Sequence, residues 1–408
     1  MAFSAALRRQ TPKLPLLLLP PRSTSSFSTQ SLRDPESKPK PEPLGRTFSL
    51  LRSSIRSEPD PDRICTLFQS STHLPRFYHG IPLHQLAVAR LAQLRRPDLV
   101  GRILESLKSD PLAPKSEGFL IRIISLYSSA GMLDHAVKTF DEMPTRTERS
   151  FSALLSAYYH NGRTDLLNEK FLSLPKKLGI APGVWSYSIY LKSLCKTGEI
   201  ANAVELLDEM SKSELTVPNI VSYNTVLDGC VKHGDEVNFE KIFKIVSDRK
   251  LEVNVVTYNY RLAMFCRRSE SFKAEELLAV MAAREVEPNL ASFNTVIQGF
   301  CREGDVGSAV RVFRMMKGKE EVVPNSKTYV ALIRSLVEKG EYAVGLEICK
   351  ECFARKFAPP FETVKGLIGG LVKDDRSEEA KEIVAKMKGA VRGDAAEAWK
   401  KFEAELAL

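Results

Sequence analysis

The stretch PNIVSYNTVL at residues 218–227 decides the fold, because the chain repeats it at nearly fixed intervals. Close copies stand at 253–262 (VNVVTYNYRL) and 288–297 (PNLASFNTVI), and a partial copy stands at 324–333 (PNSKTYVALI). The aromatic residue of the phrase recurs every 35 or 36 residues, as Phe151, Tyr187, Tyr223, Tyr258, Phe293 and Tyr329. A fixed period of this length is typical of repeat architectures, which stack one supersecondary unit on the next.

Other landmarks follow the same period. A glycine stands about eleven residues after the aromatic, a small residue follows it, and a methionine closes the series. The glycine column is Gly162, Gly198, Gly234, Gly304 and Gly340, with Ser269 in the remaining slot, and the small-residue column is Ala203, Ala274, Ala309 and Gly345. Independent columns that share one period exclude coincidence.

Within a unit the apolar residues have helical spacing. Tyr223, Val226, Leu227 and Cys230 fall at i, i+3, i+4 and i+7, and a second run at 305–319 repeats the pattern behind Asp305, a suitable N-cap. Each unit is therefore a helical hairpin, and we predict an all-α, right-handed α-solenoid. The units are 117–147, 148–183, 184–219, 220–254, 255–289, 290–325, 326–360 and a ragged 361–391.

The two ends of the chain differ from the repeats. Residues 1–33 contain five cations and no acid, which indicates an organelle-targeting peptide, mitochondrial or else chloroplast, with a secretory signal as the alternative. Without those cations the formal net charge falls from +9 to +4, so bulk charge says little about a nucleic-acid partner. Residues 34–46 read as a linker, 47–116 as degenerate leading repeats, and 392–408 as a C-terminal helix that caps the stack or docks a partner. We expect no transmembrane segment.

A 35-residue hairpin that opens with Val-Thr-Tyr-Asn, has Gly midway and ends in Pro-Asn resembles the pentatricopeptide repeat (PPR). The resemblance covers 117–391, is strongest across 184–325, and points to the P-type of the family. The layout is similar to small plant mitochondrial members, some of which associate with the small subunit of the mitochondrial ribosome. The resemblance implies binding of single-stranded RNA at about one base per repeat.

In this family the fifth and last residues of a unit, here called its reading pair, select the base. The resemblance therefore implies four pairs: Ser188 with Asn219, Asn224 with Asn254, Asn259 with Asn289, and Asn294 with Asn325. The second residues Trp185, Val221, Val256 and Ala291 would sandwich the bases. The implied target is adenine followed by three pyrimidines (5′-A-Y-Y-Y-3′), with the N-terminal unit at the 5′ end of the RNA. Other units carry Ile121/Thr147, Ser152/Gly183 and Val330/Pro360, and we expect them to read nothing.

Each of these features has a structural alternative. An Asn or Ser near a helix start can simply cap the helix. The four units also share a row of cations, Lys196, Lys232, Arg267 and Arg302, two residues before the glycine slot. Such cations can contact RNA phosphates, or they can complement the dipole at a helix C-terminus.

The sequence offers no pattern for catalysis. Cys195, Cys230, Cys266 and Cys301 recur with the repeat, which favours buried packing positions over a metal site. The pair Cys349 and Cys352 has no second pair of ligands beside it. We therefore expect no enzyme activity, no metal, no cofactor and no small-molecule substrate.

The implied target sequence is too short to identify a single transcript. Adenine followed by three pyrimidines occurs about once in 32 nucleotides, and specificity depends on the number of competing sites. This favours a protein that acts in mitochondrial RNA metabolism or translation on an abundant RNA, such as that of the ribosomal small subunit. The alternative is an α-solenoid scaffold that binds a protein without recognising RNA sequence.

Overall fold

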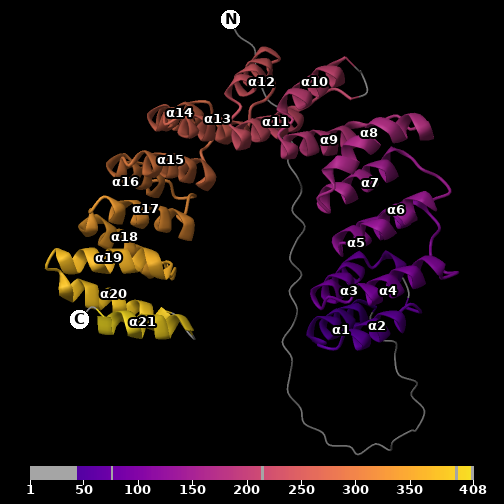
Figure 1. Cartoon of the computed structure of the whole chain (residues 1–408), viewed down its shortest axis with the longest axis horizontal. Helices are drawn as coiled ribbons and strands as arrows, with labels where there is room; N and C mark the ends of the chain where they lie inside the picture. Colours follow the sequence, from indigo (N-terminus) through magenta and orange to yellow (C-terminus); the bar gives the residue numbers. More distant parts are fainter. Residues whose placement is uncertain (1–43, 75–76, 213–215, 391–393, 406–408) are drawn as a thin grey trace, which may run out of the picture. The chain divides into compact units, whose positions relative to one another are not determined.

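The computed structural model describes residues 44–74, 77–212, 216–390 and 394–405. Throughout these residues the regular structure is helical and contains no strand, and Figure 1 shows the helices following one another as hairpins. The predicted α-solenoid is confirmed. No helix within the described ranges is both long and apolar enough to cross a bilayer.

Two helices fall within each predicted unit from 117 onward. The helices are α1 Leu44–Ser57, α2 Pro61–Gln69, η1 Phe77–His79, α3 Ile81–Gln93, α4 Pro97–Ser109, α5 Glu117–Ser129, α6 Leu133–Asp141, α7 Glu148–His160, α8 Thr164–Leu178, α9 Val184–Thr197, α10 Ile200–Ser211, α11 Ile220–His233, α12 Glu236–Asp248, α13 Val255–Arg267, α14 Ser271–Ala283, α15 Leu290–Glu303, α16 Val306–Lys317, α17 Ser326–Glu338, α18 Tyr342–Ala354, α19 Phe361–Lys373, α20 Ser377–Ala390 and α21 Asp394–Glu405.

The chain divides into residues 1–50 and a compact unit formed by residues 51–408. In the larger unit the first helices of successive repeats, from α5 to α19, pack directly on one another. Each second helix packs on its own first helix and, apart from α12, on the first helix of the next repeat. Helix α12 meets α13 through the ion pair of Glu240 with Arg261 at 2.6 Å. The first helices thus form a continuous layer, and their surface over α9, α11, α13 and α15 is called the first-helix surface below.

Local chemistry sets the ends of the first helices. Asn219, Asn254, Asn289 and Asn325 are the N-caps of α11, α13, α15 and α17. At the opposite end the glycine column adopts positive φ, which is the region glycine tolerates best. Ser269, which replaces glycine in one unit, has φ of 57° and therefore adopts the same left-handed turn.

The repeat columns fill the core between hairpins. Ala203, Ala274 and Ala309 are completely buried, and Tyr223 and Tyr329 are at most 1% exposed. The ring of Tyr329 lies 5.8 Å from that of Phe313, edge to face. Small residues on the second helix and aromatic residues on the first therefore let successive units approach and leave little void.

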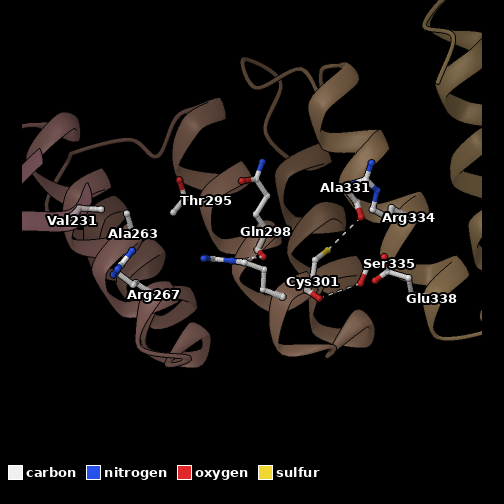
Figure 2. A pocket seen from close by; sticks show the side chains of 11 residues that line it. Val231, Ala263, Arg267, Thr295, Gln298, Cys301, Ala331, Arg334, Ser335 and Glu338 are labelled. Carbon is white, nitrogen blue, oxygen red and sulfur yellow. Dashed lines mark hydrogen bonds between the residues drawn. The ribbon is translucent and has the colours of Figure 1, made fainter. Parts of the chain in front are cut away.

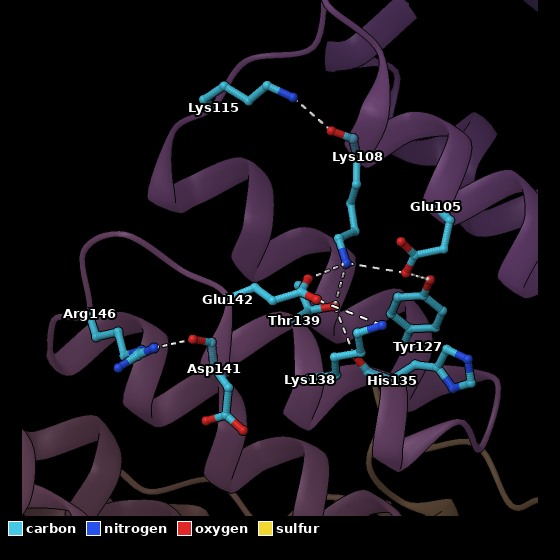
Figure 3. Close-up of polar contacts among 10 residues, drawn as sticks. All are labelled: Glu105, Lys108, Lys115, Tyr127, His135, Lys138, Thr139, Asp141, Glu142 and Arg146. Atoms are coloured by element: carbon cyan, nitrogen blue, oxygen red, sulfur yellow. Dashed lines mark hydrogen bonds and ion pairs between the residues drawn. The ribbon is translucent and has the colours of Figure 1, made fainter.

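A polar network joins the leading repeats to the first regular unit (Figure 3). Lys108 of α4 lies 3.2 Å from Glu105 and 2.9 Å from Glu142, the C-cap of α6. Tyr127 of α5 donates a hydrogen bond to Glu105 across 2.7 Å, and burial together with this carboxylate raises the pKa of the phenol. Residues 82–116 are thereby tied to the array despite their weak repeat pattern.

The two ends of the described chain can be compared with the segments expected from the sequence. Helix α1 begins at Leu44, within the last residues of the expected linker at 34–46, and residues 34–43 lie outside the described residues. The helix starts directly after Pro43, where the dense prolines end and an apolar pattern begins with Phe48, Leu51 and Ile55. The proposed targeting peptide at 1–33 lies outside the described residues. At the other end Trp399 of α21 is buried, with its ring 4.7 Å from Phe361.

Candidate nucleic-acid interface

Exposed apolar side chains stand in a row at the second position of four consecutive units. Trp185 is 75% exposed, Val221 60% and Val256 44%, and Ala291 is also exposed. Each lies in the first turn of α9, α11, α13 or α15. Large apolar side chains arranged at one repeat spacing on one surface indicate contact with a ligand rather than core packing.

The structure brings the reading pair of unit 255–289 together. The Nδ2 of Asn259 lies 3.4 Å from the Oδ1 of Asn289, although the two residues are 30 positions apart. The hydroxyl of Ser292, in the next helix, donates to the Oδ1 of Asn259 across 2.6 Å and lies 3.1 Å from the Oδ1 of Asn289. One serine thus fixes both amides.

The pair of unit 290–325 has the same arrangement. The hydroxyl of Thr328 lies 2.7 Å from the Oδ1 of Asn294 and 3.1 Å from that of Asn325. Sequence reasoning overlooked Ser292 and Thr328. The available signal was a column of hydroxyl residues at the third position of every unit from 184 onward, namely Ser186, Ser222, Thr257, Ser292, Thr328 and Thr363.

The two remaining pairs are not linked in this way. The Oδ1 of Asn224 is buried without a hydrogen-bond partner, and the Asn224 side chain is only 7% exposed. The hydroxyl of Ser188 donates to the backbone oxygen of Val184 at 2.7 Å. An unpaired buried acceptor costs free energy unless a ligand satisfies it, so the Asn224 oxygen marks a position where a donor is missing.

Capping accounts for the last residues of the pairs but not for the fifth. The Oδ1 of Asn219 accepts from the backbone nitrogens of Val221 and Ser222 at 3.0 and 3.1 Å. Asn254, Asn289 and Asn325 do the same in their own helices. By contrast Asn224, Asn259 and Asn294 lie inside the helix, one turn after the cap, where an amide has no capping role.

All four members of the cation row are exposed. The Nη2 of Arg302 lies 3.4 Å from the backbone oxygen of Cys266, at the C-terminus of the neighbouring first helix. Lys232 pairs with Asp228 at 2.5 Å, and this hydrogen bond raises the pKa of the lysine. Lys196 lies 5.0 Å from the ring centre of Tyr159. The cations of this row are therefore exposed to solvent, and at least Arg302 also contacts a helix end.

Two members of the row line a cavity of about 620 Å³ between α13, α15 and α17 (Figure 2). Arg267, Arg302 and Arg334 contribute guanidinium groups to it, and Gln298 contributes an amide. Arg334 was not predicted, because its unit lacks a polar reading pair. Glu338 also lines the cavity, so three guanidinium groups face one carboxylate. The net positive lining suits an anion, since each guanidinium offers several N–H donors.

The cysteines have the environment of packing residues. Burial raises the pKa of Cys195 and of Cys230 to about 12. It raises the pKa of Cys266 and of Cys301 to about 11, although Cys301 is partly exposed. Among the described residues no group of three or more His, Cys, Asp or Glu side chains is placed to hold a metal ion.

Comparison with known proteins agrees with this geometry. The model of the PPR repeat family matches residues 182–232, 218–267 and 288–338, and that of the PPR repeat matches 122–146 and 362–390. A mitochondrial pentatricopeptide repeat-containing protein of Arabidopsis thaliana is 30% identical over 368 residues, covering 89% of this chain and 86% of that protein. The chain belongs to the pentatricopeptide repeat family.

Two further proteins are similar to this PPR protein. The small ribosomal subunit protein mL103 (rPPR7) of Arabidopsis thaliana is 29% identical, covering 89% of this chain and 88% of that protein. The crystal structure of the pentatricopeptide repeat protein PPR10 from maize superposes with a TM-score of 0.50 at 19% identity. The superposition covers 88% of this chain and 60% of PPR10, and at this identity it supports only the assignment of the fold.

Proposed function

We propose that this PPR protein binds single-stranded RNA along its first-helix surface and acts without catalysis in mitochondrial RNA metabolism or translation. The carrying observation is the linked amide pair, Asn259 of α13 with Asn289, the N-cap of α15. The same two helices carry the exposed side chains of Val256 and Ala291. A base held between those side chains would present its edge to the amides. Units 184–219 to 290–325 would read adenine followed by three pyrimidines.

The bound amides offer donors to a pyrimidine, but adenine N1 and guanine O6 would accept them too, so the preference for pyrimidines rests on the family resemblance. The carbonyl oxygens of Asn259 and Asn294 already accept hydrogen bonds from Ser292 and Thr328. What remains available on these amides is N–H, a donor. The O2 of uracil or cytosine is an acceptor on the Watson–Crick edge, so both pyrimidines offer this donor a partner.

The partner we propose is the small subunit of the mitochondrial ribosome. The relative mL103, which this chain matches over nearly its whole length, bears the name of a small ribosomal subunit protein. The short target favours the same conclusion, because a site that occurs about once in 32 nucleotides cannot select one messenger. Stacking contributes about 1–3 kcal/mol per base, which gives four bases a moderate affinity that assembly on a ribosome would reinforce.

The test is to replace Asn224, Asn259 and Asn294 together by Ala. Folding should survive, because Asn224 has no partner for its oxygen, and Ser292 and Thr328 still have the capping amides as acceptors. We expect binding of an A-C-U-C RNA to weaken at least tenfold with unchanged helicity. Asn202→Ala, an exposed amide on α10, is the matched control.

Crosslinking of the tagged protein in isolated mitochondria tests the partner. Dominant recovery of small-subunit ribosomal RNA is the expected result. Unchanged affinity of the triple variant, combined with no crosslinked RNA above background, would instead favour the protein-binding scaffold.

A further inference from the structure

Unit 148–183 lacks the last side chain of a reading pair, but the structure places another polar group there. A Cβ built on Gly183 would lie 3.0 Å from both Cδ and Oε1 of Glu148. The Glu148 carboxylate, from the first residue of the same unit, therefore occupies the space that a side chain at 183 would take. It also replaces the missing cap, since the backbone nitrogen of Ser186 lies 3.2 Å from its Oε1.

The same carboxylate is bonded to the fifth residue of the unit. The hydroxyl of Ser152 donates to the Oε1 of Glu148 across 2.9 Å. The hydroxyl of Ser186 lies 3.2 Å from that oxygen, so Oε1 is fully occupied. Oε2 accepts no hydrogen bond from the described residues. Glu148 with Ser152 thus replaces Gly183 with Ser152 as the polar pair of this unit.

The second positions around this pair are also suited to a base. Arg149 of α7 and Trp185 of α9 are both exposed, and the two helices pack directly on each other. Neighbouring helices lie about 8–10 Å apart, which leaves room for one base between long side chains. Guanidinium planes and indole rings are effective stacking partners for bases.

We infer that unit 148–183 holds a guanine site, with Glu148 reading the base edge and Arg149 and Trp185 stacking on its faces. The inference rests on the proposed function. The remaining Oε2 offers two lone pairs and no donor, and guanine is the base whose Watson–Crick edge carries two adjacent donors, N1–H and N2–H₂, for this one oxygen to accept. Adenine, cytosine and uracil each offer one donor position beside an acceptor that the carboxylate would repel. The site lies 5′ of the adenine, so the full target becomes G-A-Y-Y-Y.

Unit 117–147 provides an internal contrast. Glu117 occupies the same first position, and its Oε1 lies 3.0 Å from the backbone nitrogen and 2.7 Å from the hydroxyl of Thr147. In that unit the last residue has its own side chain, and the fifth residue, Ile121, cannot form a hydrogen bond. A carboxylate at the first position is therefore not sufficient, and Glu117 serves as the matched control.

The experiment measures binding of four RNAs, 5′-AANACUCAAA-3′ with N as each base, to the full chain and to its Glu148→Gln and Glu117→Gln variants. The glutamine keeps an oxygen for Ser186 and adds a donor beside it, so the fold should be retained. We expect guanine at N to bind about tenfold more tightly than the other three bases. Glu148→Gln should remove this preference, and Glu117→Gln should keep it.

The outcomes separate the two proposals. Equal, tight binding of all four RNAs would overturn the guanine site and leave the proposed function intact. A guanine preference that survives in Glu148→Gln would overturn the assignment to Glu148. Failure of all four RNAs to bind would overturn both. Fluorescence gives a second readout, because Trp185 is exposed while the other tryptophan, Trp399, is buried, so stacking would quench Trp185 selectively.

Discussion

Replacing Asp228 by Asn should strengthen RNA binding if the cation row contacts phosphates. Asp228 holds Lys232 at 2.5 Å on the exposed surface of α11, so it neutralises one member of the row. Removing its charge frees the ammonium for a phosphate. A contact between two unit charges about 4 Å apart in water contributes about 1 kcal/mol, which corresponds to a roughly fivefold gain in affinity at low salt.

Salt dependence distinguishes this effect from an indirect one. Each phosphate contact to a single strand adds about 0.7 to the slope of log K against log salt. Between 50 and 200 mM salt the Asp228→Asn variant should therefore lose about 2.6-fold more affinity than the parent chain. Titration of a labelled A-C-U-C RNA at several salt concentrations measures both quantities.

The chain offers a matched control for this substitution. Asp208 and Lys212 form the same i,i+4 pair at 2.8 Å, but on α10, a second helix away from the first-helix surface. Asp208→Asn should change neither the affinity nor the salt slope. If Asp228→Asn behaves like Asp208→Asn, the cations serve the helix ends and the phosphate interpretation is wrong. The loss of either pair costs the helix only a few tenths of a kcal/mol.

Three further predictions concern stability and reactivity. Burial, with Arg122 nearby, lowers the pKa of His84 to about 4. Below about pH 6.5 the unfolded chain therefore binds more protons than the folded chain, and the free energy of unfolding decreases as the pH decreases. We expect a loss of about 2 kcal/mol between pH 7 and 5 in urea titrations, and a smaller loss for His84→Leu; equal losses would contradict this. The buried hydroxyl of Thr363 lacks a hydrogen-bond partner, because Val330 stands where other units have Asn. Thr363→Val should therefore raise the free energy of unfolding by about 1 kcal/mol. Thr328→Val should lower it, because the hydroxyl of Thr328 is bonded to Asn294. The raised pKa values of Cys195 and Cys230 predict that both thiols react slowly with thiol reagents at pH 8 until the chain unfolds. They also predict that the free energy of unfolding decreases as the pH rises above about 8.5. Fast labelling of the folded chain would refute the first prediction.

The repeat architecture could be predicted from the sequence because it depends on local chemistry that recurs. The asparagines at unit ends cap the following helices, and the glycine column supplies left-handed turns. Even the exception follows the rule, since Ser269 adopts the turn that its neighbours assign to glycine. Helix caps and left-handed turns depend on a few adjacent residues, so they can be recognised in the amino-acid sequence.

The interface was less accessible because its contacts cross between units. Alignment by column pairs Ser152 with Gly183 and suggests a site with no polar group at the last position. The structure shows that Glu148 reaches across to that position, which an alignment of columns cannot express. Likewise, the directions of the Asn259 and Asn294 amides depend on hydroxyls from the next helix, those of Ser292 and Thr328.

On the proposed function, these contacts give a physical reason why one scaffold would read different bases. The N-terminal end of each first helix needs an oxygen to cap it, and that need fixes which atom of the capping side chain faces inward. When an asparagine caps, its oxygen is used, as at Asn219, and its N–H groups remain as donors. When Glu148 takes over the cap at Gly183, one carboxylate oxygen is used and the other remains, so the unit presents an acceptor. Donors and acceptors on the first-helix surface therefore follow from how each helix is capped. A substitution that changes the cap should change the preferred base, while the packing columns that hold the units together remain as they are.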